Sequence, residues 1–146
     1  MALVPPLDDD NFDPELLEFV QFFKGPLGVI PNSVRTMARR PEIARAFTNL
    51  NIAVMKCDAG VTPEFKRLIG YMTSYVSGCR YCQAHTILGS ERFGSTEARL
   101  NDVWNFENSQ HFNEAEKAAL TFARAAAMVP NEVDDEISDK LREHWD

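Results

Sequence analysis

Three residues near the middle of the chain have the types and the spacing for thiol chemistry: Cys79, Cys82 and His85. Residues three apart on a helix lie on neighbouring ridges, so Cys79 would face Cys82, and Cys82 would face His85. Two facing thiols can form a disulfide, and an imidazole beside a thiol can take its proton and later return it. The spacing therefore predicts a redox-active cysteine pair, with His85 as the partner of Cys82 more than of Cys79.

The residues before this cluster predict that a helix begins at Cys79. Ser77-Gly78 interrupts an apolar pattern, which leaves Cys79 beside unpaired backbone N–H groups and the positive end of a helix dipole, where a thiolate is favoured. We interpret Arg80 as an exposed arginine and Tyr81 as a packing residue. The helix start favours Cys79 as the more reactive thiol, whereas the position of His85 favours Cys82.

Cap patterns and apolar periodicity indicate the two helices that position these residues. Thr62-Pro63-Glu64 combines an N-cap residue with proline at the first helical position. An amphipathic pattern follows, carried by Phe65, Leu68, Ile69, Met72, Tyr75 and Val76. A second helix is expected over 79–93, antiparallel to the first or sharply kinked from it at Gly78.

The rest of the chain shows the same helical character. Asp13-Pro14-Glu15 begins a helix that Gly25-Pro26 is expected to stop, and Asn113 with Glu116 fits a capping box. A longer helix from Pro41 carries an apolar stripe made of Ile43, Ala46, Phe47, Leu50, Val54 and Cys57, which predicts that Cys57 is a buried core thiol. No segment alternates with period two, so no strand is expected. These patterns predict an all-α bundle of about six to eight helices over 13–146, preceded by a Pro- and Asp-rich arm over 1–12.

Composition excludes several classes of protein. The 146 residues carry a net charge of −7, which disfavours binding to nucleic acid or to anionic lipid. No apolar run approaches the roughly 20 residues that span a bilayer, and the first residues do not resemble a secretory signal. The chain has three cysteines, an odd number that suits a reducing compartment. We therefore expect a cytoplasmic protein that binds neither nucleic acid nor membrane.

The stretch from Lys66 through Ser77-Gly78-Cys79-Arg80-Tyr81-Cys82-Gln83-Ala84-His85-Thr86 resembles the carboxymuconolactone decarboxylase superfamily, and most closely its alkylhydroperoxidase (AhpD-like) branch. Segments around Pro31-Asn32, Arg40-Pro41-Glu42 and 112–120 are also similar to that branch. The resemblance implies an AhpD-like helical bundle that assembles into trimers or hexamers. It also implies an antioxidant thiol peroxidase or disulfide oxidoreductase without a cofactor, acting on a peroxide, with organic hydroperoxides preferred. A thiol or dithiol protein would return the disulfide to the dithiol.

The same resemblance assigns the site residues. Cys79 and Cys82 match the cysteine pair and His85 matches the histidine, although many relatives place that histidine four residues after the second cysteine. The branch also has a proton-relay glutamate twelve residues before the first cysteine, where this chain has Arg67. Glu64, one turn earlier, is the candidate replacement if its side chain reaches the site; the alternative is a first-turn acid that faces the helix dipole. We expect Cys82 to attack the peroxide with His85 as its base, and Cys79 to resolve the sulfenic acid. Four apolar side chains could shape a pocket for an organic peroxide, although their default role is core packing: Tyr71, Met72, Tyr75 and Ile87.

Three alternatives remain open from the sequence. Cys79, Cys82 and His85 could hold zinc with a fourth ligand from His111, His144 or a carboxylate, although three ligands within one helix make poor tetrahedral geometry. The arginine at position 67 leaves room for a protein that senses redox state or binds a partner without turnover. The superfamily also contains decarboxylases that act on lactones, but these do not use a cysteine pair.

Overall fold

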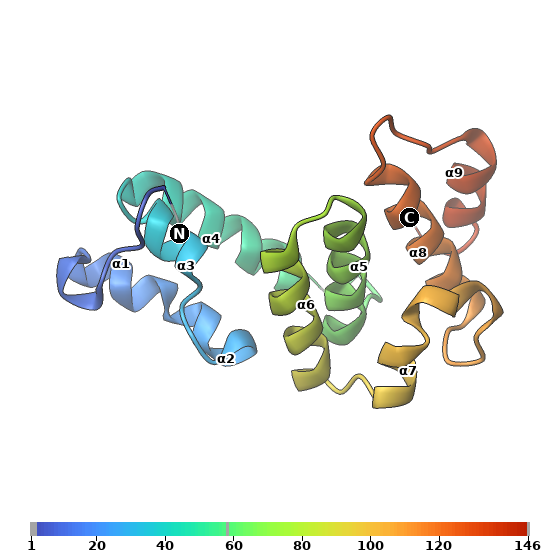
Figure 1. Ribbon diagram of the computed structural model, residues 1–146, viewed down its shortest axis with the longest axis horizontal. Helices are drawn as coiled ribbons and strands as arrows, with labels where there is room; N and C mark the ends of the chain where they lie inside the picture. The colour runs from blue at the N-terminus through green and yellow to red at the C-terminus, as the bar shows by residue number, and fades with distance from the viewer. Residues whose placement is uncertain (1–2, 58, 146) are drawn as a thin grey trace. The chain divides into compact units, whose positions relative to one another are not determined.

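A computed structural model describes residues 3–57 and 59–145, and these residues form helices and no strands. The expected all-α class is therefore confirmed over this part of the chain. The α-helices are α1 (Pro14–Phe19), α2 (Lys24–Leu27), α3 (Asn32–Met37), α4 (Pro41–Lys56), α5 (Pro63–Val76), α6 (Arg80–Arg92), α7 (Glu97–Asn101), α8 (Glu114–Ala126) and α9 (Asp135–Arg142) (Figure 1). Three 3₁₀ helices, Asp9–Asn11, Val20–Phe23 and Val103–Asn108, complete the set. The chain divides into two compact units, Met1–Ala59 and Gly60–Asp146, which are described separately.

The first unit contains α1 to α4 and the described part of the N-terminal arm. The arm packs on α3, because the backbone N–H of Leu7 donates to the Arg35 carbonyl (3.3 Å) and the Arg35 guanidinium donates to the Leu7 carbonyl (3.0 Å). Arg35 also pairs with Asp9 at 2.6 Å. Residues 1 and 2 of the predicted arm lie outside the described residues.

The helix predicted to run from Asp13 to Gly25-Pro26 is interrupted earlier and ends later than expected. Asp13 caps α1 through its side chain as expected (2.8 Å to the Leu16 N–H), but Val20–Phe23 tightens into a 3₁₀ turn. The prediction that Gly25-Pro26 stops the helix is wrong, because both residues lie inside α2 and the chain instead turns at Gly28, whose φ is 75°.

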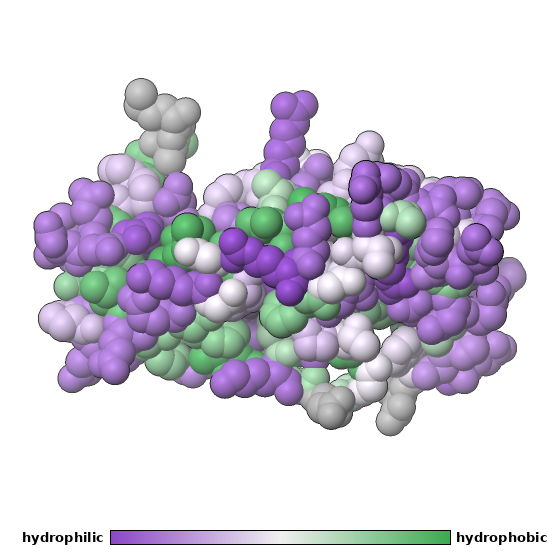
Figure 2. Space-filling view, turned by 90° about the horizontal axis from the view of Figure 1, so that it is seen from below, coloured by the Kyte–Doolittle hydropathy of each residue, from purple (hydrophilic) through white to green (hydrophobic). Residues whose placement is uncertain are grey.

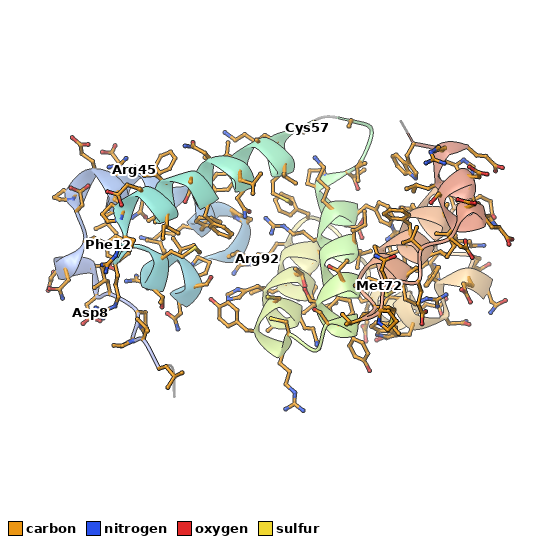
Figure 3. The ribbon with its side chains drawn as sticks, turned by 90° about the horizontal axis from the view of Figure 1, so that it is seen from above. Asp8, Phe12, Arg45, Cys57, Met72 and Arg92 are labelled. Carbon is orange, nitrogen blue, oxygen red and sulfur yellow. The ribbon has the colours of Figure 1, made fainter. Side chains whose placement is uncertain are left out.

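The apolar stripe of α4 also differs from the prediction. Ala44 and Thr48 form the fully buried face, whereas Ile43 and Leu50 are more than half exposed. Cys57 is exposed as well and follows the last residue of α4 (Figure 3). The prediction of a buried core thiol at Cys57 is therefore wrong, because that residue lies beyond the helix end and on the exposed stripe.

The second unit is built around α5 and α6, which lie side by side and run antiparallel (Figure 1). We call this pair the α5–α6 hairpin. One side of α5 packs against α8, and α9 packs on α8 in turn. The core of this unit consists mainly of Phe65, Leu68, Met72, Val103, Phe106, Phe112 and Leu120, all buried. Trp145 joins it and donates its indole N–H to the Ala115 carbonyl at 3.0 Å.

Two glycines allow the two helices of the hairpin to approach closely. A Cβ atom added at Gly70 would lie 3.1 Å from the Thr86 methyl group, and one added at Gly89 would lie 3.1 Å from the Arg67 Cδ atom. Such contacts are tighter than ordinary van der Waals packing, so a larger residue at either position would push the helices apart or displace its neighbour. The hairpin is therefore held in a fixed register by small residues.

The surface mixes charged and apolar side chains, as the purple and green areas of Figure 2 show. Among the described helices, none has both the length and the apolar character that crossing a membrane would require.

Candidate functional site

The cysteine pair lies at the turn that joins α5 to α6, at the top of the hairpin in Figure 1. Gly78 adopts φ 73°, a conformation that glycine takes without a Cβ penalty, and it directs the chain back on itself. The N–H of Cys79 donates to the Ser74 carbonyl at 2.8 Å, which satisfies the end of α5. Cys79 is the N-cap residue of α6, so the predicted helix start is confirmed.

The two thiols face each other at the first turn of α6. Their Sγ atoms lie 2.7 Å apart, within hydrogen-bond distance and beyond the roughly 2.05 Å of a disulfide. The Cys79 Sγ also accepts a hydrogen bond from the Cys82 backbone N–H at 3.3 Å. The pair is therefore a dithiol in which Cys79 receives an additional backbone donor.

These contacts separate the acidities of the two thiols. The side-chain hydrogen bond with Cys82 is the main cause that lowers the pKa of Cys79, and the backbone N–H of Cys82 adds to it. The same thiol–thiol hydrogen bond, together with burial, raises the pKa of Cys82 to about 11. Cys79 is thus the more acidic thiol of the pair, and Cys82 keeps its proton at neutral pH. This order is the opposite of the one expected from the position of His85.

His85 is half-buried one turn after Cys82. It makes an edge-on contact with the ring of Tyr81, with centroids 4.5 Å apart. Burial lowers the pKa of His85, so the imidazole is neutral at pH 7 and can accept a proton. The i, i+3 spacing brings it to the side of α6 that carries Cys82.

A shallow cavity of about 330 Å³ opens at the thiols. It is lined by both cysteines, by Ala126 and Ala127 at the end of α8, and by hydroxyl-bearing residues of the last turns of α5. The side chains considered as pocket walls do not line this cavity: Met72 is buried in the core, its default role, and Tyr71 and Tyr75 pack against the Trp104 ring, with centroids 5.9 Å and 4.1 Å from it. The fourth predicted wall residue, Ile87, is not among the lining residues either.

Glu64, the candidate proton relay, lies at the other end of the hairpin. It occupies the first turn of α5, and the 14 residues of that helix separate it from the thiols by about 20 Å. Its carboxylate pairs with the Arg99 Nε at 3.0 Å and accepts a hydrogen bond from Ser95. The expectation that Glu64 replaces the family glutamate is not met by this geometry, since its side chain cannot reach either cysteine.

The partners of Glu64 form a compact ionic cluster, which we call the Arg99 cluster: Glu64, Ser95, Arg99 and Glu116. Arg99 lies between two carboxylates, at 3.0 Å from Glu64 and 2.5 Å from Glu116, and its guanidinium stacks over Phe112 at 4.3 Å. Burial alone would lower the pKa of Arg99, but its hydrogen bonds with Glu116 and Glu64 outweigh burial and raise the pKa. Sequence reasoning found Glu116 only as a capping residue and missed Arg99, because 35 residues separate Arg99 from Glu64.

Arg67, which stands where the branch has its glutamate, packs against α6. Its aliphatic atoms lie on Gly89, and its Nε is buried without a hydrogen-bond partner. Burial lowers the pKa of Arg67. The substitution therefore places a cation, rather than a carboxylate, against the helix that carries the thiols and His85.

Within residues 3–57 and 59–145, no three His, Cys, Asp or Glu side chains are arranged to hold a metal ion. His111 and His144, the candidates for a fourth ligand, are both exposed. The described residues therefore contain no preformed zinc site.

Comparison with known proteins gives this geometry its context. Residues 41–125, more than half of the chain, match the carboxymuconolactone decarboxylase family. The chain belongs to that family. The resemblance inferred from the cysteine motif is therefore confirmed at the level of the family.

Two curated family relatives resemble the chain over part of their length. The uncharacterized protein YdfG of Bacillus subtilis (strain 168) is 28% identical over 82 residues, which are 56% of this chain and 56% of YdfG. The uncharacterized protein YnjA of Escherichia coli (strain K12) is 31% identical over 85 residues, which are 58% of this chain and 46% of YnjA. The matched region spans about half the length of these relatives.

Two crystal structures of the debrominase Bmp8 match the whole chain and 77% of Bmp8. A variant in complex with 2,3,4-tribromopyrrole gives a TM-score of 0.91 at 29% identity, and the apo protein gives 0.88 at 31%. The helical fold predicted from the resemblance is therefore confirmed. Enzymes occur among proteins of this fold, and the solved neighbours are debrominases.

Proposed function

We propose that this protein is a thiol-dependent oxidoreductase of the alkylhydroperoxidase type, whose Cys79–Cys82 pair cycles between dithiol and disulfide as it reduces organic hydroperoxides. The observation that carries this proposal is the geometry of the pair, with sulfurs 2.7 Å apart and acidities that differ strongly. A nucleophilic thiolate beside a protonated thiol is the arrangement that two-step peroxide reduction requires.

The reaction would proceed in two balanced steps. The Cys79 thiolate attacks one peroxide oxygen, the O–O bond breaks, the alcohol leaves after taking a proton, and Cys79 becomes a sulfenic acid. The Cys82 sulfur then attacks the Cys79 sulfur, the S–O bond breaks, and water leaves as the disulfide forms. The hydroperoxide is reduced by two electrons and the dithiol is oxidised by two.

We propose the opposite order of the two cysteines to the one expected from sequence, because their contact lowers the pKa of Cys79 and raises that of Cys82. Cys79 is the attacking thiol in this proposal and Cys82 the resolving thiol. Cys82 has a pKa of about 11 and must lose its proton before it resolves the sulfenic acid, so neutral His85 on the neighbouring turn would serve as its base. Glu64 has no role in this scheme.

The proposed reaction also needs a reductant and a place where the peroxide binds. A thiol or dithiol protein would reduce the disulfide, since the dithiol must be restored for a second turnover. The protein would act in the cytoplasm as a trimer or hexamer. The shallow cavity at the thiols would receive the peroxide group.

The test is peroxide-dependent thiol loss in a Cys57→Ser background, which removes the exposed third cysteine from the count. One equivalent of cumene hydroperoxide should remove both remaining thiols and yield an intramolecular disulfide. Cys82→Ser should stop at a sulfenic acid that dimedone traps, and Cys79→Ser should react only at the rate of an ordinary thiol. Slow oxidation in the parent protein, at the same rate as in both variants, would contradict the peroxidase and favour a sensing or binding role.

Reductive dehalogenation is a second candidate, favoured by the similarity to Bmp8 over the whole chain. In this reaction the Cys79 thiolate would take bromine from an aryl bromide, the ring carbon would gain a proton, and Cys82 would displace bromide as the disulfide forms. Bromide release from 2,3,4-tribromopyrrole, measured against thiol loss at one bromide per disulfide, would support this candidate. Thiol loss without bromide would remove it.

A further inference from the structure

Arg67 is a charged side chain whose surroundings in the second unit offer it no counter-ion. Its Nε is buried without a hydrogen-bond partner, and within the described parts of the chain its guanidinium forms no ion pair. The side chain is half-buried rather than sealed, so an external group can reach the guanidinium. Buried charges are costly unless paired, and an arginine left in this state therefore requires an explanation.

The nearest acidic side chain on the same helix is already engaged. Glu64 lies three residues before Arg67, the spacing of a helical ion pair, but its carboxylate is bound to Arg99 and Ser95. Glu116 is bound to Arg99 as well. The Arg99 cluster thus engages the acidic residue of α5 that has the spacing to pair with Arg67.

The position of Arg67 connects it to the thiols. Cys82, His85, Gly89 and Arg92 follow one another at i, i+3, i+7 and i+10 along α6, so they share one face of that helix. Arg67 covers this face at Gly89, with its Nε 3.3 Å from the position that a Cβ would take there. Arg92 lies on the last turn of α6 (Figure 3), is exposed, and has no described ion pair. The face therefore has a redox end and a cationic end about 10 Å apart along the axis.

We propose that Arg67 binds an anionic group, of the carboxylate class, on the substrate of the Cys79–Cys82 dithiol. The inference rests on the proposed function and narrows its substrate to organic hydroperoxides that carry a carboxylate. A planar guanidinium can bind a carboxylate through two parallel hydrogen bonds, and Arg92 adds a second cation on the same face of α6. In a chain with a net charge of −7, this local excess of positive charge is the feature that would select an anion.

The experiment compares a long-chain fatty-acid hydroperoxide with its methyl ester, which has the same O–O bond and lacks the charge. The second-order rate constant of thiol loss is measured for each in the Cys57→Ser background. The ratio of acid to ester should be about 10 to 100 in the parent, as expected for one charge-assisted bidentate contact. Arg67→Gln should bring the ratio to about one and Arg67→Lys should give an intermediate value.

The matched control is Arg142→Gln, which removes the same charge from an exposed site on α9 and should keep the parent ratio. A second measurement needs no variant, since the ratio should fall as ionic strength rises from about 0.01 to about 1 M, where screening shortens from about 30 to about 3 Å. A parent ratio near one, or a ratio unchanged in Arg67→Gln, would overturn the role of Arg67 and leave the peroxidase standing. Failure of both the acid and the ester to oxidise the thiols would instead overturn the proposed function itself.

Discussion

At the α7 end of the α5–α6 hairpin, Arg99 lies between Glu64 and Glu116 and all three charges are bonded. At the opposite end, Cys79 and Cys82 lie in a shallow cavity, and the hydrogen bond between them makes Cys79 the more acidic thiol. The two ends belong to the same pair of helices but use charge differently. Paired charge at one end joins α5, α7 and α8, whereas at the other end a contact between two thiols makes one of them more acidic.

The largest effect on stability should come from removing the positive charge of Arg99, which Glu64 and Glu116 share. Arg99→Met would leave two carboxylates facing each other at a largely buried site, and we expect a loss of about 3–5 kcal/mol in the free energy of unfolding. Urea unfolding followed by circular dichroism measures this loss. Arg142→Met removes an exposed arginine from a pair with Asp139 and should cost less than about 0.5 kcal/mol. Equal losses in the two variants would show that the Arg99 cluster does not carry the stability assigned to it.

At the thiol end of the hairpin, replacing one cysteine should change the reactivity of the other. Cys79→Ala removes the hydrogen bond that is the main cause of the raised pKa of Cys82, so that pKa falls from about 11 toward an ordinary thiol value. Alkylation of Cys82 by iodoacetamide at pH 8 should then speed up about tenfold or more, even though a less basic thiolate is a weaker nucleophile.

The reverse variant should move the pH profile in the other direction. In the parent, the lowered pKa of Cys79 lets its alkylation persist to more acidic pH than for a free thiol. Cys82→Ala removes the largest cause of that shift, so the pKa of Cys79 rises and its alkylation at pH 7 slows. Mass spectrometry of the alkylated peptides over pH 5–10 distinguishes the two sites. Identical profiles in the parent and both variants would contradict the coupling.

Glu64→Gln tests whether the Arg99 end of the hairpin takes part in the thiol chemistry, because the sequence suggested Glu64 as the proton relay. The variant removes one charge from the Arg99 cluster and should lower the free energy of unfolding by about 1–3 kcal/mol. The rate of thiol loss with cumene hydroperoxide should stay within about twofold of the parent rate. A slowing of tenfold or more without a change in stability would restore Glu64 to the site.

The smallest effect is expected at the edge of the cluster. The Glu116 carboxylate accepts from the Asn113 backbone N–H at 3.0 Å, and the Asn113 side chain accepts from the Glu116 N–H at 2.9 Å. Asn113→Ala breaks half of this capping box and should cost about 1 kcal/mol in thermal or urea unfolding. Thr121→Ala, within the same helix but away from the cap, is the control and should cost clearly less.

The sequence predicted best what is encoded locally. The helix starts at Asp13, Thr62, Cys79 and Asn113 each depend on a side chain that bonds to a backbone N–H three residues on, so they were readable from short patterns. The facing of Cys79 and Cys82 follows from the same rule.

What the sequence could not predict depends on partners far along the chain. Periodicity placed the buried stripe of α4 on the face that carries Leu50, whereas the structure buries the face that carries Ala44 and Thr48. The spacing of His85 suggested a reactive Cys82, whereas the direct thiol contact decides the acidities in the structure. The ion pair between Glu64 and Arg99 joins residues 35 positions apart, and no short sequence pattern indicates it.

The Cys79 sulfur is also the cap of α6, since it accepts the Cys82 N–H. A disulfide sulfur carries no charge and is a poor acceptor, so oxidation would remove this cap at the same moment that it joins the two residues. The Cys82 N–H would then lose its acceptor, and its amide proton would exchange faster with solvent in the oxidised protein. The exchange rate of this one amide would therefore distinguish the dithiol from the disulfide.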